Sequence, residues 1–379
     1  MIFLKRRAMM TRASFNYKTV SGIGSITLEN CVETRFKRLE LFGNSAQGEN
    51  PNIESPKEIK NSGKYDETSG KYVIDVSVTG KNLFDINSFP YKQDDETIVI
   101  NSNEAYGGAL LVKGDILRRK QYVISIESFE NIGDNTSTVL LETVYKDGVK
   151  DERYLTAIPK TGWVLSSTRE IDYIWIRNPW KAGSKIKKLQ IEEGKEATEY
   201  EPYHEPQTVQ LQLDEPLRGI GEYKDVITKD GILRRIKEIV LDESTDFETY
   251  WATLNKTFAF ISPTIKDATV INNTPNRLLC NYFKVLPYGL DRTDEEVCVL
   301  FNRRFHIRFL KERNIDTVEK LKEWLKQNPI KIQYLLQEPA LEPFENSLDS
   351  LHANDGTTII TVDSGEVETG IEVEYAVKE

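Results

Sequence analysis

The chain has 379 residues, and its 50 Lys and Arg against 60 Asp and Glu give a formal charge of −10. Its length allows two or three domains, and its 39% apolar and 29% charged residues are typical of globular rather than disordered proteins. Three Cys, three His and three Met exclude most metal enzymes, disulfide-rich scaffolds and Met-rich binding surfaces, while the negative charge argues against a nucleic-acid partner.

The first ten residues combine a short apolar run with a basic cluster, and we expect residues 1–10 to be disordered. The apolar run precedes the basic residues, which is the reverse of a secretory signal peptide. No stretch of the chain approaches the roughly 20 apolar residues that span a bilayer, so we expect no membrane insertion. Alternation of apolar and polar residues then predicts strands at 25–29, 37–43 and 72–78.

The middle of the chain, residues 82–203, is rich in short strand patterns without a helical period between them. The predicted strands are 97–100, 109–112, 121–128, 138–145, 162–166, 173–178 and 187–192. A Lys-Asp-Gly sequence at 146–148 predicts a hairpin turn, because Gly supplies the positive φ that such a turn needs. Many short strands at close intervals indicate a β-sandwich, which we interpret as a jelly roll.

The last part of the chain contains one convincing helix among strands. Asp316 is a good N-cap residue, and Glu319 completes a capping-box pattern before apolar residues at helical spacing; Asn328-Pro329 ends the helix. Strands are predicted at 209–213, 232–241, 258–261 and 330–335. A final hairpin is predicted from 357–362 and 370–375 around a turn at 363–365.

These elements predict a mainly β protein in which a jelly-roll β-sandwich, residues 82–203, is inserted in a second β-rich domain. The strands in residues 11–81 are too few for a stable domain of their own. We therefore expect residues 11–81 and 204–379 to fold together as a composite domain that carries the one short α-helix. Such an insertion requires Gly80 and His204 to lie close together.

No residue pattern in the sequence indicates catalysis. Cys31, Cys280 and Cys298 are far apart and lack CxxC spacing, which favours buried thiols in a reducing compartment over a disulfide or a metal site. Neighbouring acidic residues on a strand point to opposite faces, so no adjacent pair can flank one glycosidic bond. We expect no enzyme, no cofactor and no metal site.

The densest group of aromatic and charged residues lies near the end of the middle domain. On a strand, Tyr173, Trp175 and Arg177 share one face, and two isoleucines share the other, which is the natural core face. Trp180 follows a proline in the adjoining loop. Aromatic rings stack on sugar rings and planar polar groups bond sugar hydroxyls, so these four residues are candidates for carbohydrate binding. The alternative is that both faces are buried and that Trp175 is a core residue.

Several short motifs, taken together and in this order, resemble those of one group of proteins. In the middle domain they are GKNLFD at 80–85, LQIEEG at 189–194 and ATEYEPY at 197–203. In the flanking segments they are GSITLEN at 24–30, LFGNSAQ at 41–47, LRGIGEYKD at 217–225 and WLKQNPIKIQY at 324–334. They resemble tail, baseplate and fibre proteins of phages and prophages that infect Firmicutes, in which a carbohydrate-binding-like jelly-roll module is common.

The resemblance implies a structural component of a phage or phage-like tail, baseplate or fibre, located in the virion, that contributes to host attachment. By analogy of fold, it implies that the jelly roll binds a host cell-surface glycan. The implied partners are other tail or baseplate proteins and further copies of the chain, in a homotrimer; no catalytic residue is implied. Two alternatives stay open: a purely structural tail component without sugar binding and, well behind it, a glycan-degrading tail enzyme with two carboxyls roughly 5–9.5 Å apart.

Overall fold

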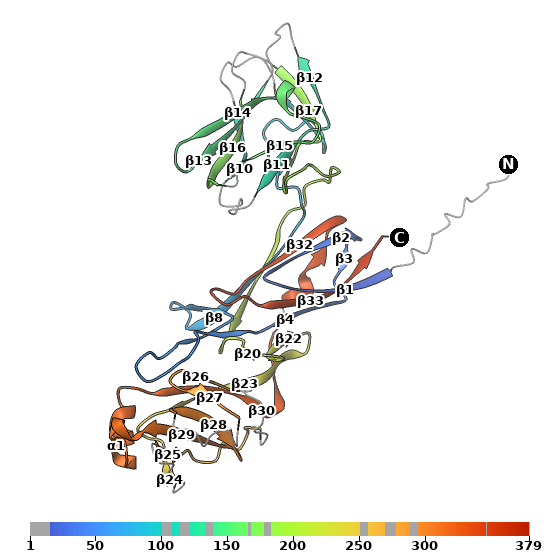
Figure 1. The fold of residues 1–379 in the computed structure, drawn as a ribbon. Coiled ribbons are helices and arrows are strands. Elements are labelled where there is room, and N and C mark those ends of the chain that lie inside the picture. The colour runs from blue at the N-terminus through green and yellow to red at the C-terminus, as the bar shows by residue number, and fades with distance from the viewer. Residues whose placement is uncertain are drawn as a thin grey trace, which may run out of the picture.

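The structure is a computed structural model that describes residues 16–100, 108–113, 121–132, 139–165, 168–177, 183–250, 257–269, 278–287, 295–345 and 347–378. The described chain is mainly β and carries one α-helix, as the sequence predicts. Figure 1 shows three units in a row: an upper unit from β9 (Thr97–Ile100) to β18 (Gln190–Glu193), a central unit, and a lower unit that includes the helix α1 (Val318–Leu325). Residues 1–10, which we expect to be disordered, lie outside the described part.

The upper unit is a sandwich of two β layers. One layer is the sheet β10 (Gly108–Lys113), β16 (Ile171–Arg177), β13 (Leu140–Tyr145) and β14 (Lys150–Tyr154). The other layer contains β9, β17 (Gly183–Lys187), β12 (Ser128–Ile132), β18, β11 (Tyr122–Ser125) and β15 (Trp163–Val164). Along the chain, β12 follows β11 and β18 follows β17. β11 pairs with β18 and β12 pairs with β17 in the same antiparallel register. The buried core between the layers comes entirely from residues 84–191, so the unit buries its own apolar surface.

The strands of the upper unit differ from the predicted ones at two breaks and at one additional strand. Each of the predicted strands 121–128 and 187–192 is interrupted: β11 ends before β12 begins, and β17 ends before β18 begins. In the second interruption Lys188 adopts a left-handed conformation with φ of 53°. The sequence does not predict β14, because its Lys-Asp-Glu-Arg-Tyr residues have no apolar face and it is an edge strand. The predicted turn at 146–148 does join β13 to β14, with Gly148 at φ of 81°.

The central unit is built on a long antiparallel sheet whose strands come from both ends of the chain. The order is β19 (Gln207–Leu213), β8 (Lys71–Thr79), β32 (Gly356–Asp363), β2 (Ser25–Cys31), β33 (Gly370–Val377), β4 (Arg38–Phe42) and β22 (Val226–Thr228). The sheet continues through β23 (Gly231–Leu241), β30 (Ile330–Glu342) and β26 (Leu278–Cys280). At its side, β1 (Asn16–Ile23) pairs with β33, and β7 (Lys64–Asp66) pairs with β8.

The predicted C-terminal hairpin is wrong, although both of its strands exist. Gly365 has the positive φ of a turn residue, 85°. However, β32 pairs with β2 and β8, whereas β33 pairs with β1 and β4 and meets β2 at one residue pair, Cys31 and Val377. β2 therefore stands between β32 and β33 in the strand order of the sheet. A local turn signal cannot reveal this arrangement, because the strand that separates the pair comes from the other end of the chain.

The two segments that lead into and out of the upper unit lie side by side. β8 and β19 are antiparallel neighbours, with Val78 opposite Gln207. Just beyond them, a Cβ placed on Gly80 would lie 2.9 Å from Cδ2 of His204. The upper unit therefore leaves and rejoins the central sheet at one edge, as an insertion requires (Figure 1).

Outside the upper unit, the described residues form two large hydrophobic cores and one small cluster around Ile236, a finer division than the sequence predicts. The central core combines residues 26–78, 211–232 and 348–375, whereas the lower core uses residues 241–334. A five-stranded sheet of the lower unit contains β24 (Glu248–Tyr250), β25 (Thr257–Ile261), β29 (Arg304–Leu310), β28 (Val297–Phe301) and β27 (Lys284–Val285). The long pair of β23 and β30 runs through both units and joins them.

Three small sheets and three short 3-10 turns complete the described fold. The sheets are β20 (Gly219–Ile220) with β21 (Tyr223–Lys224), β3 (Thr34–Arg35) with β31 (His352–Ala353), and β5 (Ser45–Gln47) with β6 (Ile59–Asn61). The 3-10 turns are Leu155–Ala157, Lys311–Arg313 and Ser347–Ser350.

The N-cap of helix α1 lies one residue after the predicted one. Its N-cap is Thr317, whose hydroxyl accepts a 3.3 Å hydrogen bond from the backbone N–H of Lys320. Asp316, the predicted N-cap, instead forms a 2.7 Å ion pair with the Lys320 ammonium group. Asp and Thr are both favourable N-caps, so residue type alone does not separate two adjacent candidates. Leu321 and Leu325 are buried against the lower core, as the apolar spacing predicts.

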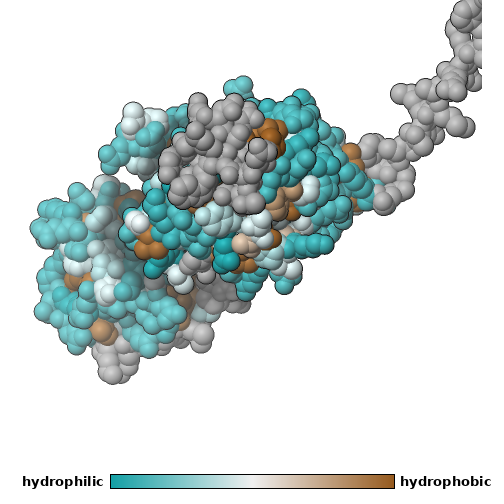
Figure 2. All heavy atoms as spheres, turned by 90° about the horizontal axis from the view of Figure 1, so that it is seen from above, coloured by the Kyte–Doolittle hydropathy of each residue, from teal (hydrophilic) through white to brown (hydrophobic). Residues whose placement is uncertain are grey.

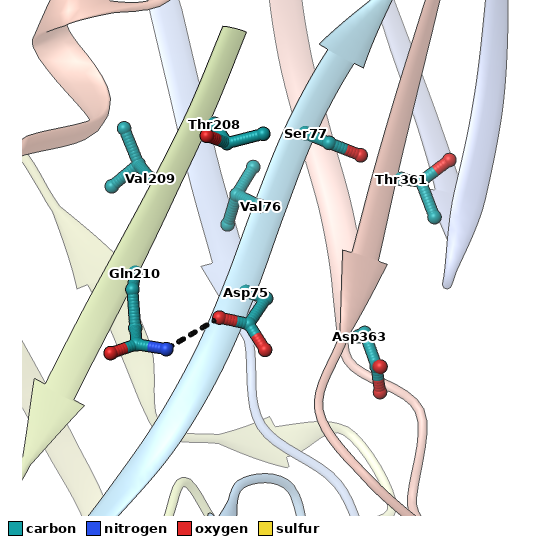
Figure 3. Close-up of a pocket in the computed structure, with 8 residues that line it drawn as sticks. All are labelled: Asp75, Val76, Ser77, Thr208, Val209, Gln210, Thr361 and Asp363. Atoms are coloured by element: carbon teal, nitrogen blue, oxygen red, sulfur yellow. Dashed lines mark hydrogen bonds between the residues drawn. The ribbon is translucent and has the colours of Figure 1, made fainter. Parts of the chain in front are cut away.

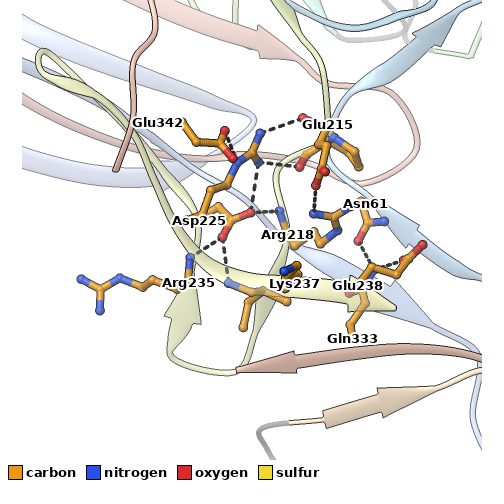
Figure 4. Close-up of polar contacts among 12 residues, drawn as sticks. Asn61, Glu215, Arg218, Asp225, Arg235, Lys237, Glu238, Gln333 and Glu342 are labelled. Carbon is orange, nitrogen blue, oxygen red and sulfur yellow. Dashed lines mark hydrogen bonds and ion pairs between the residues drawn. The ribbon is translucent and has the colours of Figure 1, made fainter. Parts of the chain in front are cut away.

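A buried ion network fixes the start of the β23–β30 pair (Figure 4). The Asp225 carboxylate is fully buried and accepts hydrogen bonds from the backbone N–H groups of Arg218, Arg235 and Ile236 at 3.1, 2.7 and 3.0 Å. It also accepts a 3.2 Å bond from the Arg234 guanidinium. The register of β23 against β30 shifts between Arg234 and Ile236, so the carboxylate binds N–H groups next to a bulge.

Candidate functional site

The strand β16 presents the residues that the sequence singles out. Ile174 and Ile176 are fully buried in the sandwich core, whereas Tyr173, Trp175 and Arg177 are half-buried and point to the opposite, outer face. This is the alternation predicted from the sequence, and Trp175 is not part of the core. The fourth candidate, Trp180, lies outside the described residues.

The register of the four-stranded sheet brings further side chains to the same outer face. Residues directly opposite each other on antiparallel strands project to the same side. Across β10, β16, β13 and β14, the register defines three rows: Lys113, Tyr173, Val144 and Lys150; Leu110, Trp175, Glu142 and Glu152; Gly108, Arg177, Leu140 and Tyr154. We call this set the outer face of the upper unit.

Trp175 is held against the sheet by two neighbours. A Cβ placed on Gly108 would lie 2.1 Å from Nε1 of the indole, so the ring occupies the space that any larger residue at 108 would need. The ring of Tyr173 meets that of Trp175 edge to face, with centroids 6.1 Å apart and an angle of 67°. The indole is therefore positioned by two features: Gly108 has no side chain, and the ring of Tyr173 contacts it.

Beside Trp175, the outer face carries a cluster of opposite charges. The Arg177 guanidinium lies 2.7 Å from Oε2 of Glu142 and donates a 2.9 Å hydrogen bond to Glu152. The ammonium group of Lys150 lies 3.4 Å from Oε1 of Glu142. The Glu142 side chain is only 3% exposed, whereas those of Arg177 and Glu152 are 34% and 47% exposed. One buried carboxylate thus anchors charged groups that remain accessible to solvent.

The two carboxyls also affect each other. A hydrogen bond with Glu142 and partial burial raise the pKa of Glu152, while the positive charges of Arg177 and Lys150 act in the opposite direction. A carboxyl that is kept near another carboxyl has good acceptor oxygens and gains from contact with an outside donor. The sequence does not predict a role for Glu142 and Glu152, because only the strand pairing places them beside Trp175.

The described part of the protein also has a shallow hollow on the central sheet (Figure 3). It has a volume of about 380 Å³ and lies over β19, β8 and β32. Its two carboxylates are already engaged: Asp75 accepts a 3.0 Å bond from Gln210, and Lys64 bridges Asp75 and Asp363 at 3.3 and 2.6 Å. Its lining residues are Asp75, Val76, Ser77, Thr208, Val209, Gln210, Thr361 and Asp363. Without an aromatic ring in this lining, the hollow offers no platform for stacking a ring.

The rest of the described surface adds no competing site of a familiar kind. Seen from above, the described residues form a mainly hydrophilic surface with small hydrophobic spots (Figure 2). Within the described ranges, no group of His, Cys, Asp and Glu is arranged to hold a metal ion. In the same ranges, no helix has the length and apolar character needed to cross a membrane. The three cysteines are buried and free.

Comparisons with known proteins do not supply a family for the chain. No family model and no curated protein matches it. A search of solved structures returns the structure of infectious bursal disease virus Gx strain, with 11% sequence identity over 96% of this chain and 82% of that chain. The TM-score is 0.08, so this likeness carries no argument about fold or function.

Proposed function

We propose that the protein is a structural component of a phage or phage-like tail, baseplate or fibre, and that its inserted β-sandwich binds a host cell-surface carbohydrate. The observation that carries the binding part of the proposal is the outer face, where the half-buried Trp175 lies beside the Arg177, Glu142 and Glu152 cluster. An exposed aromatic ring stacks on the apolar side of a sugar, and charged planar groups at its edge bond the hydroxyls. The assignment to a phage or phage-like tail is supported by the short sequence motifs described above, which together and in this order resemble those of phage tail proteins.

The arrangement of the units suits this role. The upper unit has its own core and joins the central sheet through two adjacent segments, so it can present the outer face at a distance from the other two cores. The central and lower units share the β23–β30 pair and form the part that would contact other tail proteins and further copies of the chain. Repetition of a weak sugar site in an oligomer raises avidity by roughly 10²–10⁴.

A second candidate function is a purely structural role, in which the outer face docks onto another tail protein. The same residues favour it to some degree, because Trp, Tyr and Arg are enriched at protein interfaces. Binding to isolated cell walls separates the two, since a docking face has no reason to recognise a glycan.

The proposal is tested by co-sedimentation of the full chain with purified host cell walls. We expect Trp175→Ala to weaken binding by about tenfold or more, because it removes the stacking surface. The matched control is Tyr65→Ala, which removes an aromatic ring that is 59% exposed on the central unit and should leave binding unchanged. Equal binding by the wild type and Trp175→Ala would contradict a sugar site on the outer face.

A further inference from the structure

The strand β1 forms an open edge of the central unit (Figure 1). Among the described residues it pairs with β33 alone, in one unbroken register over Asn16–Ile23. The strand contains no proline and no bulge, and Lys18 is its one charged residue. Natural sheets protect exposed edges with such features, because unpaired backbone groups at an edge bond readily to another strand. This eight-residue edge is therefore a surface on which a further strand can pair.

The hydrogen-bond pattern shows which backbone groups of β1 face the open edge. The N–H of Gly24, directly after β1, donates a 3.0 Å hydrogen bond to the carbonyl oxygen of Thr369. Bonded residues alternate along an antiparallel pair, so the even-numbered residues of β1 direct their N–H and C=O groups to β33. The odd-numbered residues direct theirs to the open edge; they are Tyr17, Thr19, Ser21 and Ile23.

The side chains of these odd-numbered residues are self-complementary. Tyr17 and Ile23 are large apolar residues that are 55% and 60% exposed on the same face of the strand. If a second copy adds its own β1 antiparallel to the first and centred on Val20, Tyr17 of each copy lies opposite Ile23 of the other. Thr19 then lies opposite Ser21, and hydroxyl side chains in such cross-strand pairs bond each other. One two-fold arrangement thus pairs the free backbone groups and covers both apolar side chains.

The charges fit the same register. Lys18 of one copy lies opposite Gly22 of the other, so the two lysines stay apart and neither meets a facing side chain. Diagonal to Lys18 is Gly24 of the second copy, and a Cβ placed on Gly24 would lie 3.1 Å from the carboxyl carbon of Glu368. Diagonal partners are roughly 7–8 Å apart, a distance that a lysine side chain spans. The pairing therefore brings a cation towards a carboxylate at each end of the contact.

We infer that β1 joins two copies of the chain by antiparallel strand addition, with Val20 of one copy opposite Val20 of the other. The contact is isologous, so it has a two-fold axis and does not continue into an open filament. A single strand pair is small beside the roughly 1,200–2,000 Å² of a stable interface, and we expect dimers at roughly micromolar concentrations. The inference does not depend on the proposed sugar site, so either can fail without the other.

The inference is tested by analytical ultracentrifugation of the full chain from about 0.1 to about 100 μM, where we expect a reversible monomer–dimer equilibrium. Tyr17→Glu and Ile23→Lys should each weaken dimerisation by about tenfold or more. The double variant should dimerise about fivefold or more tightly than either, because each new Glu faces a new Lys of the other copy. The two positions are about 20 Å apart within one strand, so they cannot pair inside a copy. Tyr65→Glu, which replaces a 59% exposed ring on β7, should leave dimerisation unchanged.

A cysteine cross-link tests the register. Val20→Cys should form a disulfide-linked dimer on oxidation by air, because facing residues at a non-hydrogen-bonded position have Cα atoms about 4.5 Å apart. Lys18→Cys should not, since its two copies would lie about 13 Å apart, and the native cysteines are buried. Cross-linking through Lys18→Cys but not Val20→Cys overturns the register. A chain that stays monomeric, or an oligomer that neither charge change weakens, overturns the β1 contact and leaves the proposed sugar site standing.

Discussion

A missing side chain at Gly108 determines the position of the half-buried Trp175 ring in the upper unit. The indole of Trp175 occupies the volume next to the Gly108 Cα, where a Cβ would lie 2.1 Å from Nε1 and 2.6 Å from the carbonyl oxygen of Ile176. Any substitution at this position must displace the ring or shift the strand β10. The orientation of Trp175 therefore depends on a neighbouring strand as much as on its own.

We expect Gly108→Ala to weaken glycan binding by about tenfold or more, because the added methyl group displaces the indole from the sheet. The contact with the backbone of Ile176 should also lower the melting temperature by a few degrees. Calorimetric titration with the glycan and a thermal melt measure the two effects. Gly48→Ala, whose Cβ would meet only side-chain carbons of Lys57, the nearest being Cδ at 3.1 Å, is the control. Unchanged affinity in Gly108→Ala would contradict the assigned position of Trp175.

The pair of carboxyls predicts a pH effect on stability. Because contact with Glu142 raises the pKa of Glu152 in the folded protein, the folded state holds this proton more tightly than the unfolded state. The associated stability is therefore fully present below the unfolded pKa and is lost as the pH rises through the folded pKa. Lys150 and Arg177 reduce the effect, and the half-exposed position of Glu152 keeps it small.

Glu152→Gln removes this proton-dependent contribution. We expect its melting temperature relative to the wild type to be more favourable at about pH 7 than at about pH 4, since only the wild type suffers carboxylate repulsion at the higher pH. Thermal unfolding at both pH values measures the difference, with Glu130→Gln in β12 as the control. The opposite sign would show that Glu152 and Glu142 do not interact as described.

At the scale of elements, the β23–β30 pair carries the connection between two cores. Its register shift at Arg234 and Ile236 is stabilised by Asp225, which is fully buried and has four hydrogen-bond donors around it. The Arg234 guanidinium also bonds Glu342 at 2.8 Å. A buried charge whose partner is removed is strongly destabilising, because the remaining charge stays away from water.

We expect Asp225→Ala to cost about 3–5 kcal/mol of the free energy of unfolding, since it leaves Arg234 and three backbone N–H groups without this acceptor. Chemical denaturation followed by far-UV circular dichroism measures the loss. Asp230→Ala, in the exposed turn before β23, should cost less than about 0.5 kcal/mol. A comparable small loss in Asp225→Ala would mean that the network does not hold this junction.

The same elements show what the sequence can and cannot predict. The alternation in β16 follows from local pattern, because Ile174 and Ile176 need burial and leave Tyr173, Trp175 and Arg177 outward. Strand partners do not follow from local pattern. The insertion of β2 between β32 and β33 and the row that places Glu142 and Glu152 beside Trp175 depend on pairing between distant segments. For this reason the sequence indicates one strand of the candidate site and misses the rest.

At the scale of the whole molecule, the upper unit has its own hydrophobic core and joins the central sheet through two segments. Its buried core draws on residues 84–191 alone, while β8 and β19 pair directly beneath it. Its entry and exit meet at Gly80 and His204, so the two ends of the unit are already adjacent. Domains with their own core and neighbouring termini commonly fold when they are separated from the chain.

We therefore expect a fragment of residues 80–204 to fold alone. It should show one cooperative thermal transition, and Trp163→Ala should lower its midpoint strongly, because Trp163 is a buried core residue. Differential scanning calorimetry of the fragment and of the full chain tests this. A fragment without a cooperative transition would show that the upper unit needs the central sheet to fold.

The most direct test of the central claim follows the five tryptophan indole N–H signals of the full chain by NMR while a cell-wall glycan is added. The signal of Trp175, assigned by Trp175→Phe, should shift in a saturable way, because the sugar stacks on this ring. The signals of Trp163, in the upper core, and Trp324, packed against the lower core, should stay in place. A glycan that binds without shifting Trp175, or that shifts only Trp163 or Trp324, would contradict a carbohydrate site on the outer face.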